Sequence, residues 1–571
     1  MANDVADGVK AVSFDIFDTL ILRPFATPSD LFYLVEQESG IVGFHDKRIK
    51  AESDARREKR SEITLDEIYA QLDLPKEIKD LEIEIEKTVC FRNEAVCSML
   101  ESYGRDHQIL LISDMYLPRE VIESILEKLG IRYDRLYISS EAGKTKHHGD
   151  LFDLVLSDLG IKPDELLHIG DNKRADVRIP ESKGIRTRFI ESPISCYLRT
   201  HYDERRYLRR HYNLTSSIII ALDAIREEND DIWYDIGNKY GGPLAYSYCR
   251  YLMDVCEDDS LIAFVSRDGY SLERCLKILE PEANTCYLHL QRLLNDIFFN
   301  KLMLTKEEVS YPNKLSELTP YLKMEANLRK IMNYFSELFP DGIPDDSDRL
   351  ISLFNEKKSE MNRLRLEQLE RFKSHVSELC RDKNVELVDC TTMRFSSQKF
   401  LERVLGRKVK GHYSITLSDS SLEYDSMYRW PYPIIGWSRV NLPEFLLCSP
   451  ELPICGWNDD DPVYDDEAPE WEKERAENYP KLSDGICDYS QKMASIFGRH
   501  LPAMDYPAIL PWIMLSSAKG TKYRAFLQDI KWASNTDHTD WSPIIPWDDV
   551  KGMLRRYAID ILSMMDKKST D

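Results

Sequence analysis

Val12-Ser13-Phe14-Asp15-Ile16-Phe17-Asp18-Thr19-Leu20, residues 12–20, is the stretch that decides how the first third of the chain folds. Residues 10–14 form a short β-prone run, and Asp15 follows it directly. In open α/β folds, buried parallel strands carry functional groups just beyond their carboxyl ends. The stretch therefore predicts a central strand with Asp15 at one edge of a parallel sheet. Many strands end in an aspartate only because aspartate favours turns, so a functional role for Asp15 needs support from the other motifs.

Two further apolar runs, at residues 108–112 and 165–169, also end in polar groups and alternate with helical stretches. This alternation predicts a parallel, doubly wound sheet. The polar groups that the pattern brings to one edge are a hydroxyl, an ammonium and carboxylates, from Ser113, Lys144 or Lys146, Asp171 and Asp176. Phosphoryl transfer needs such a set: a nucleophile, donors for the phosphoryl oxygens and carboxylates for Mg²⁺.

The order Asp-x-x-x-Thr, then Ser, then Lys, then Gly-Asp-x-x-x-x-Asp resembles the motifs of the haloacid dehalogenase (HAD) superfamily over about residues 9–190. The resemblance implies that Asp15 is the nucleophile, that Ser113 holds the transferring group and that Lys146 neutralises it. Lys144 is the rival to Lys146, which is favoured because Phe152 follows it by six positions, as in the family's lysine motif.

The same resemblance implies a Mg²⁺ cofactor. Asp15 and Asp171 would bind the ion together with the backbone carbonyl of Phe17, and Asp176 would support the metal shell. The substrate implied is a small phosphorylated molecule.

Phe17 departs from the family pattern, because the family's phosphatases have a general-acid aspartate at this position. In an extended strand end, successive side chains point to opposite sides, so Asp18 is not expected to replace it. Three interpretations stay open: a site for good leaving groups or slow transfer, since loss of general acid catalysis costs about 10²–10⁴-fold; a dehalogenase-like site; or phosphate binding without turnover. The intact Gly170-Asp171 favours phosphoryl chemistry, because the dehalogenases use no metal.

Charge runs and apolar faces predict helices between the first two motifs. At Thr64, with Glu67 three residues later, the sequence has a capping box. The place of this segment, about residues 25–105, matches the family's helical cap. We expect a HAD-like domain at 1–195, a basic linker helix at 196–230, a second α/β domain at 231–455, and an acidic connector with a helical C-terminal region at 456–571.

The second α/β pattern has strands at residues 261–265 and 385–388. Each is followed by charged residues at a strand-to-helix turn, where ligands bind in such folds. These residues are Arg267, Asp268, Asp389 and Arg394. One interpretation is a second site for an anionic or sugar ligand, and the other is an Arg–Asp pair that ties two turns together.

The composition limits the classes of partner. The 571 residues carry a net charge of −23, which disfavours binding to nucleic acid, and no apolar run reaches the length of a membrane span. Twelve cysteines without CxxC spacing and a polar, acidic N-terminus predict a cytoplasmic protein with reduced thiols.

Several motifs together, among them residues 14–20, 63–69, 113–117 and 266–270, resemble a bacterial branch of HAD hydrolases linked to glycosyltransferases of surface-polysaccharide synthesis. We therefore expect a Mg²⁺-dependent HAD-type phosphohydrolase or phosphotransferase acting on a phosphorylated sugar or nucleotide-sugar-type metabolite, with such glycosyltransferases as partners. The alternative is a HAD unit that only senses phosphate or serves as a scaffold, attached to a C-terminal sugar-transferase or ligand-binding domain.

Overall fold

The structure is a computed structural model. It describes the following residues: 8–59, 62–290, 332, 335–381, 383–392, 394–429, 438–458, 461–515, 520–533 and 541–544. The chain divides into two compact units, Met1–Glu228 with Lys492–Pro511, and Asn229–Gln491 with Trp512–Asp571. The domain boundaries expected from the sequence stay predictions, and residues 545–571 of the expected helical C-terminal region lie outside the described residues.

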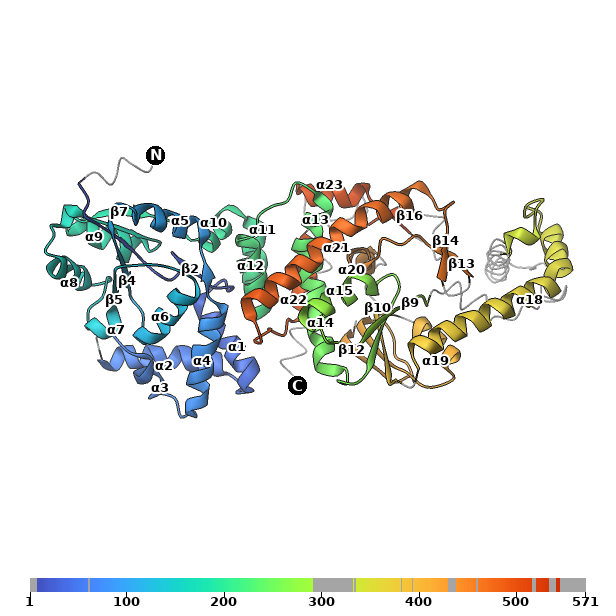
Figure 1. The fold of residues 1–571 in the computed structure, drawn as a ribbon, viewed down its shortest axis with the longest axis horizontal. Helices are drawn as coiled ribbons and strands as arrows, with labels where there is room; N and C mark the ends of the chain where they lie inside the picture. Colours follow the sequence, from blue (N-terminus) through green and yellow to red (C-terminus); the bar gives the residue numbers. More distant parts are fainter. Residues whose placement is uncertain are drawn as a thin grey trace. The chain divides into compact units, whose positions relative to one another are not determined.

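A five-stranded parallel sheet forms the centre of the first unit (Figure 1). Its order is β5-β4-β1-β6-β7, so β1 lies in the middle, flanked by β4 on one side and β6 on the other. The strands are β1 (Ala11–Phe14), β4 (Gln108–Ser113), β5 (Arg135–Ile138), β6 (Leu166–Gly170) and β7 (Arg186–Phe189). From β1 the chain adds β4 and β5 on one side of the sheet and then β6 and β7 on the other side, so the strand order reverses between β1 and β6. Ligands of doubly wound sheets bind at such a point.

Apolar side chains on both faces explain why these strands are buried. Alternate residues of β1 enter two different cores, with Val12 and Phe14 in one and Ala11 in the other. Helices α5 (Glu94–Tyr103) and α6 (Arg119–Lys128) complete the first core, and α8 (Asp150–Leu159) completes the second. The unit is therefore a three-layer α/β arrangement. The remaining short elements are α7 (Ser139–Ala142), η2 (Pro163–Glu165), η3 (Lys173–Arg178) and α9 (Ile179–Ser182).

The helical segment expected as a cap leaves and re-enters this layer through a two-stranded antiparallel ribbon, β2 (Ile21–Leu22) and β3 (Phe91–Arg92). Between them lie η1 (Pro28–Asp30), α1 (Leu31–Ser39), α2 (Phe44–Lys59), α3 (Leu65–Tyr69) and α4 (Lys76–Val89). The predicted capping box is confirmed, because Glu67 N donates to Thr64 Oγ1 and Thr64 N donates to Glu67 Oε2. Buried Arg48 forms a bidentate pair with Glu82, which holds α2 against α4.

Residues 196–230, expected as one linker helix, contain the end of α10 (Pro193–Thr200), all of α11 (Tyr202–Arg210) and α12 (Leu214–Ala224). These helices belong to the first unit. Most side chains of α12 are buried, which a polar linker would not require.

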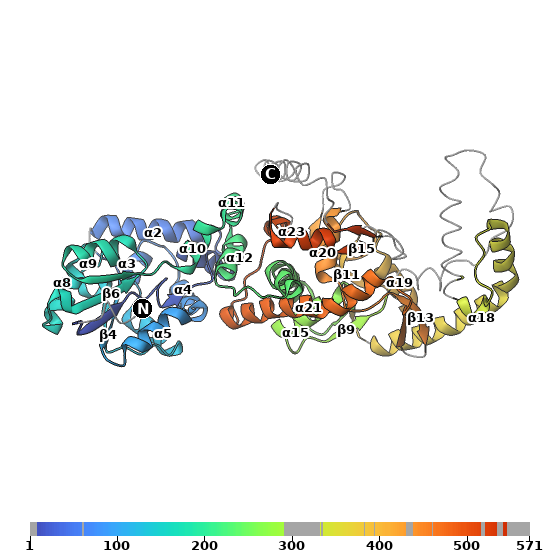
Figure 2. The same ribbon diagram turned by 90° about the horizontal axis from the view of Figure 1, so that it is seen from above.

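The second unit is built on another five-stranded parallel sheet, with the order β12-β11-β10-β8-β9. Strands β9 and β11 of this sheet are labelled in Figure 2. Its strands are β8 (Leu261–Val265), β9 (Thr285–Leu288), β10 (Val385–Thr392), β11 (Lys410–Thr416) and β12 (Tyr424–Arg429). Here the strand order reverses between β8 and β10. The fold class is therefore α/β with two parallel sheets and a largely helical C-terminal region, as the sequence predicts.

Helices account for most of the remaining described chain. They are α13 (Ile232–Ile236), η4 (Gly237–Gly241), α14 (Gly242–Val255), α15 (Gly269–Leu279), η5 (Ser336–Leu338), α18 (Ser347–Leu379), α19 (Ser396–Leu405), α20 (Ser438–Leu447), α21 (Glu470–Phe497), α22 (Tyr506–Met514) and α23 (Lys522–Asp529). Two antiparallel strand pairs complete the described part of the chain: β13 (Ile454–Asn458) with β14 (Asp461–Tyr464), and β15 (Lys531–Ala533) with β16 (Trp541–Pro543). Within the described residues, none of these helices is both long and apolar enough to cross a membrane.

Candidate active site

The carboxyl ends of β1 and β6 bring Asp15 and Asp171 to the same edge of the first sheet. Asp15 follows β1 directly, and its backbone N–H donates to Ile169 O on β6 at 2.8 Å. Asp171 follows β6 directly. Because this is the point where the strand order reverses, both carboxylates lie where doubly wound folds place their ligands.

Asp15 is a buried carboxylate with two donors. Lys146 Nζ donates to Oδ1, and Thr19 Oγ1 donates to Oδ2 at 3.0 Å. Burial raises the pKa of Asp15 to about 7, a rise that the charge of Lys146 opposes and that of Asp176 reinforces. The carboxylate is thus held in one orientation, with its ionised form costly unless positive charge lies nearby.

Lys146 bridges Asp15 to a second buried carboxylate, Asp176, to which its Nζ donates at 2.7 Å. Burial alone would lower the pKa of Lys146, but the charges of Asp15 and Asp176 raise it well above its usual range. Burial would raise the pKa of Asp176, yet Lys146 and a hydrogen bond from His168 hold it well below its usual value. The pair is therefore ionised at neutral pH.

Two further hydrogen bonds hold the carboxylate of Asp176 in place. His168 Nε2 lies 3.2 Å from its Oδ1, and Asn172 N donates to its Oδ2 at 2.9 Å. A Cβ on Gly170 would approach Asp176 Oδ2 to 2.4 Å, so only glycine fits at the end of β6. The Gly-Asp pair of the motif is thus explained by close packing around the carboxylate of Asp176.

The loop that carries Lys146 is positioned by Asp114, whose two oxygens accept from Lys146 N at 2.7 Å and from His147 N at 3.1 Å. This arrangement brings Lys146, and not the half-exposed Lys144, to Asp15. Ser113 is buried at the end of β4, the strand beside β1. Its register places it at the same edge as Asp15, as the resemblance implied.

Asp15, Asp171 and Asp176 each offer one oxygen, and these oxygens lie within 4.8 Å of one another. Burial, reinforced by the charges of Asp15, Asp18 and Asp176, raises the pKa of Asp171 to about 8. Three carboxylates therefore face one ammonium. This excess of negative charge, made only of oxygen donors, fits a hard divalent cation such as Mg²⁺. Asp15 and Asp171, which directly follow β1 and β6, are the residues that would ligate the ion, and Asp176 would support them.

The backbone after Asp15 differs from the extended strand end that we expected. Strand β1 ends at Phe14, and Asp18 adopts a left-handed conformation with φ 62°. Its N–H donates to Ile21 O at 2.8 Å, which closes a tight loop. We expected that Asp18 could not replace the acid because the strand end would be extended, and this premise was wrong. The Asp18 carboxylate lies close enough to Asp171 to raise its pKa.

Phe17 contributes its side chain to the apolar core of the first unit. The guanidinium of Arg23 stacks 4.3 Å above the Phe17 ring and pairs with Glu86 of α4 through two contacts of 2.7 Å. Burial raises the pKa of Asp18, which the charge of Arg23 partly offsets. Phe17 thus provides packing, and the residue after it, Asp18, carries a carboxyl group.

At the second sheet, the charged residues expected as a ligand site lie at the strand reversal between β8 and β10. Arg267 and Asp268 follow β8, Asp389 is part of β10, and exposed Arg394 follows it. Arg267 is largely buried and pairs with Glu472 Oε2 at 3.1 Å. A glutamate of α21 is thus one partner of Arg267, and both the ligand site and the Arg–Asp pair stay predictions.

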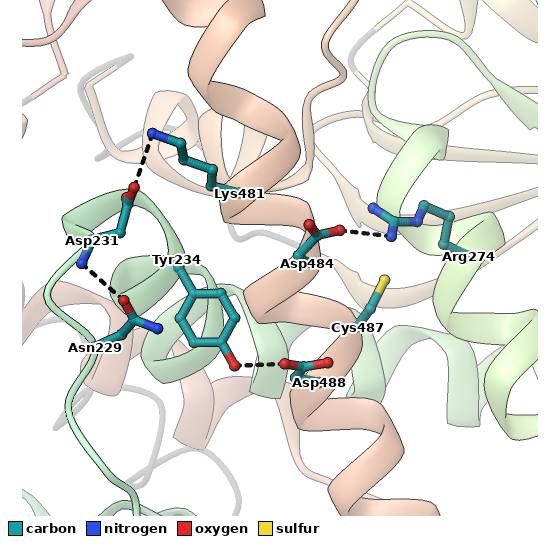
Figure 3. Close-up of a pocket in the computed structure, with 8 residues that line it drawn as sticks. All are labelled: Asn229, Asp231, Tyr234, Arg274, Lys481, Asp484, Cys487 and Asp488. Atoms are coloured by element: carbon teal, nitrogen blue, oxygen red, sulfur yellow. Dashed lines mark hydrogen bonds and ion pairs between the residues drawn. The ribbon is translucent and has the colours of Figure 1, made fainter.

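An open hollow of about 430 Å³ lies elsewhere in the second unit (Figure 3). Two pairs of its charged groups contact each other, Lys481 with Asp231 at 2.9 Å and Arg274 with Asp484 at 2.8 Å, and Asp488 accepts a hydrogen bond from the hydroxyl of Tyr234. It contains none of the residues expected from the sequence. Because its charges are satisfied internally, it offers no chemistry comparable to the edge at Asp15.

No protein-family model matches this sequence, and no curated protein matches it. Solved structures of HAD enzymes match about a third of the chain. One is an L-2-haloacid dehalogenase from Xanthobacter autotrophicus, with 16% identity, 34% of this chain and 83% of that chain covered, and a TM-score of 0.26. Another is a HAD phosphatase from Thermococcus onnurineus, with 18% identity, 32% and 86% covered, and a TM-score of 0.26.

A third is a variant HAD family enzyme from Bacteroides thetaiotaomicron, solved in complex with magnesium and inorganic phosphate. It has 14% identity, 32% of this chain and 95% of that chain covered, and a TM-score of 0.24. At these identities and TM-scores, the roles of individual residues rest on the geometry of this chain itself.

The contacts of three residues at the site were not predicted from the sequence. Thr19 was recognised as part of the motif, but its bond to Asp15 was not foreseen. His168 lies inside β6, where a buried histidine looks like any core residue. Asp114 follows Ser113 directly, and its role in positioning the Lys146 loop is evident only from the two hydrogen bonds that it accepts from that loop.

Proposed function

We propose that the first unit is a Mg²⁺-dependent HAD-type phosphohydrolase or phosphotransferase. The observation that carries the proposal is the assembly of Asp15, Lys146 and Asp171 at the strand reversal of a parallel sheet, with Asp15 held by Lys146 and Thr19. A buried carboxylate oriented by an ammonium, beside a second carboxylate suited to a cation, is the arrangement that nucleophilic attack on phosphorus requires.

In this mechanism Asp15 attacks the phosphorus atom, and the bond to the leaving-group oxygen breaks. An aspartyl phosphate forms on Asp15, and the leaving oxygen departs with the electron pair and takes up a proton. Water, or another acceptor hydroxyl, then attacks the phosphorus and regenerates the carboxylate. Lys146 stabilises the negative charge that moves onto the phosphoryl oxygens.

Ser113, at the same edge, is the candidate donor to a phosphoryl oxygen. Mg²⁺, bound by Asp15, Asp171 and the carbonyl of Phe17, would supply further charge neutralisation. Asp176 keeps Lys146 in place and charged, because it pairs with the ammonium and is itself fixed by His168.

We assign the acid and base steps to Asp18. Its raised pKa favours a protonated carboxyl group that can donate to a leaving oxygen, and its left-handed backbone conformation directs it differently from an extended strand end. The side chain of Phe17 cannot exchange protons. If Asp18 serves, alkyl phosphates are substrates; if it does not, only activated phosphates turn over.

A phosphorylated sugar or nucleotide-sugar-type metabolite is the substrate class that the resemblance to the polysaccharide-linked branch suggests. The helical segment between β2 and β3 would select it, because Arg23 of that segment, which pairs with Glu86 of α4, stacks on the Phe17 ring in the loop after Asp15. The phosphate-sensing alternative is favoured by one feature, the core position of Phe17, which leaves the acid step to a residue outside the motif.

A screen of the full-length protein separates these cases. Aryl, acyl and alkyl phosphates, sugar phosphates and nucleotide sugars are tested with Mg²⁺ and with a chelator. We expect turnover that needs Mg²⁺, and a higher melting temperature with Mg²⁺ and beryllium fluoride, since a ligand of the native state stabilises it. Fluoride binding without turnover supports the sensing alternative. The absence of both fluoride binding and turnover would falsify both the enzymatic and the sensing hypotheses.

A further inference from the structure

A second cluster of metal-ligating side chains lies in the second unit, at the start of its sheet. Cys256 directly follows α14, Glu386 is the second residue of β10, and His412 is the third residue of β11. Glu386 and His412 are fully buried, and Cys256 is half-buried. The three residues come from three separate elements, and their spacing in the sequence follows no local motif.

The side chains converge closely. One donor atom from each residue lies within 4.8 Å of the other two, and His412 Nε2 is 2.5 Å from Glu386 Oε2. The other oxygen of Glu386 accepts from Glu257 N at 2.8 Å, which fixes the carboxylate. Among the described residues, the second ring nitrogen of His412, Nδ1, is buried without a hydrogen-bond partner.

The charged side chain next to His412 is already paired. The Lys410 ammonium is 2.7 Å from the Asp425 carboxylate, which neutralises it. A buried carboxylate, a buried imidazole and a half-buried thiol thus lie together, and Lys410 does not supply a free positive charge to them.

We propose that Cys256, Glu386 and His412 bind a divalent cation of borderline softness, for which Zn²⁺ is the best match. Sulfur, imidazole nitrogen and carboxylate oxygen together form a typical zinc ligand set, and they would not suit Mg²⁺. Around a tetrahedral zinc ion such donors lie about 3.3–3.7 Å apart, so the separations here need only a small rearrangement. The ion would lower the pKa of the thiol and bind it as thiolate.

The position of the cluster indicates a structural role. It lies at the amino ends of β10 and β11, whereas ligands of doubly wound sheets bind at the carboxyl ends. An ion there would connect the end of α14 to two neighbouring strands.

Cobalt absorbance on the reduced, full-length protein tests this site, because Co²⁺ replaces Zn²⁺ and a thiolate ligand gives a sulfur-to-cobalt charge-transfer band. We expect one equivalent of Co²⁺ to produce the band and Zn²⁺ to abolish it. The oxygen donors around Asp15 cannot produce this signal, so the result is independent of the proposed phosphoryl chemistry.

Cys256→Ser is the decisive variant, and Cys286→Ser, at a half-buried thiol on β9 of the same sheet, is its matched control. The band should vanish in the first and persist in the second. Zn²⁺ should raise the melting temperature of the natural protein and of the control, but not of Cys256→Ser. Cys256→Ala, which keeps the small size without an oxygen ligand, should behave as Cys256→Ser does.

Absence of the band in the natural protein, or its survival in both Cys256 variants, would overturn the proposal. The cluster would then be a hydrogen-bonded Glu386–His412 pair beside an inert thiol. If a Cys256 variant fails to fold, as circular dichroism would reveal, the charge-transfer band and zinc competition in the natural protein still decide whether a thiolate site exists.

Discussion

The two parallel sheets differ in whether the buried charges at their strand reversals are balanced. At the first, Asp15, Asp171 and Asp176 face one ammonium, that of Lys146, and the pKa values of Asp15 and Asp171 are raised. At the second, buried Glu472 accepts from Arg475 at 2.8 Å and from Arg267 at 3.1 Å. An edge with excess buried charge is poised for a cation or substrate, whereas a paired edge is stable as it stands.

The largest effect should follow from Asp15→Asn. The amide is nearly isosteric but a far poorer nucleophile, so we expect kcat to fall by more than about 10⁴-fold. Steady-state hydrolysis of an aryl phosphate measures it. The matched control is Asp389→Asn at the second sheet, which should keep full activity. Retention of Mg²⁺-dependent turnover by Asp15→Asn would exclude the aspartyl mechanism.

Asp18→Asn tests the proposal that Asp18 is the general acid. Alkyl phosphate hydrolysis should fall by about 10²–10⁴-fold, and aryl phosphate hydrolysis should fall much less, because a good leaving group needs no proton. The ratio of the two rates is the measurement. Phe17→Asp provides the complement: a gain of up to about 10²-fold in alkyl phosphate hydrolysis is expected only where the natural acid is weak. An unchanged ratio in Asp18→Asn would assign the step elsewhere.

The fold and much of the first site followed from the sequence, because parallel strands bring their carboxyl ends together. Asp15, Lys146, Asp171 and Asp176 each follow an apolar run or precede a helix, so their convergence could be expected. The left-handed conformation of Asp18 could not, since it depends on hydrogen bonds that close the loop back onto Ile21.

Partners far apart in sequence were also beyond reach. Arg267 pairs with Glu472, which lies 205 residues later, and no local pattern links the two. The Cys256, Glu386 and His412 cluster is similar, because each residue alone resembles ordinary core or turn chemistry. Long-range packing, and not propensity, decides such contacts.

Opposite stability changes should result from the same chemical change at the two edges. Glu472→Gln removes the charge that two buried arginines share, so we expect a loss of about 3–5 kcal/mol. Asp171→Asn relieves repulsion and should raise the melting temperature of the first unit when no divalent cation is present. Calorimetric melting of both variants makes the comparison. A stabilised Glu472→Gln, or a destabilised Asp171→Asn, would break the contrast.

The pH dependence of stability should carry the same signature. Folded pKa values of about 7 for Asp15 and about 8 for Asp171 lie above the unfolded value, so the native state binds more protons between about pH 4 and pH 8. Their contribution to the free energy of unfolding therefore falls as pH rises through this window. Asp176, with a lowered pKa, acts only at lower pH.

Melting temperatures at pH 5 and pH 8, without divalent cations, measure this contribution in the natural protein and in Asp171→Asn. The natural protein should lose about 1–3 kcal/mol more across the window than the variant does. Equal slopes would mean that Asp171 titrates normally, and the excess charge at the first edge would then be smaller than the geometry indicates.

The smallest effect concerns the ligand site proposed at the second sheet. Arg267 is already paired with Glu472, so exposed Arg394 is the arginine of the pair better placed to meet an anion. Calorimetry of the full-length protein with nucleotide sugars and sugar phosphates tests this role. Because an exposed charge contributes up to about 1 kcal/mol, Arg394→Ala should weaken binding by no more than about 5-fold. Lys408→Ala, which removes an exposed charge beyond α19, is the control and should bind as the natural protein does. Equal binding by all three proteins would remove Arg394 from the site, and no heat with any ligand would leave the second edge a purely structural, charge-paired counterpart of the first.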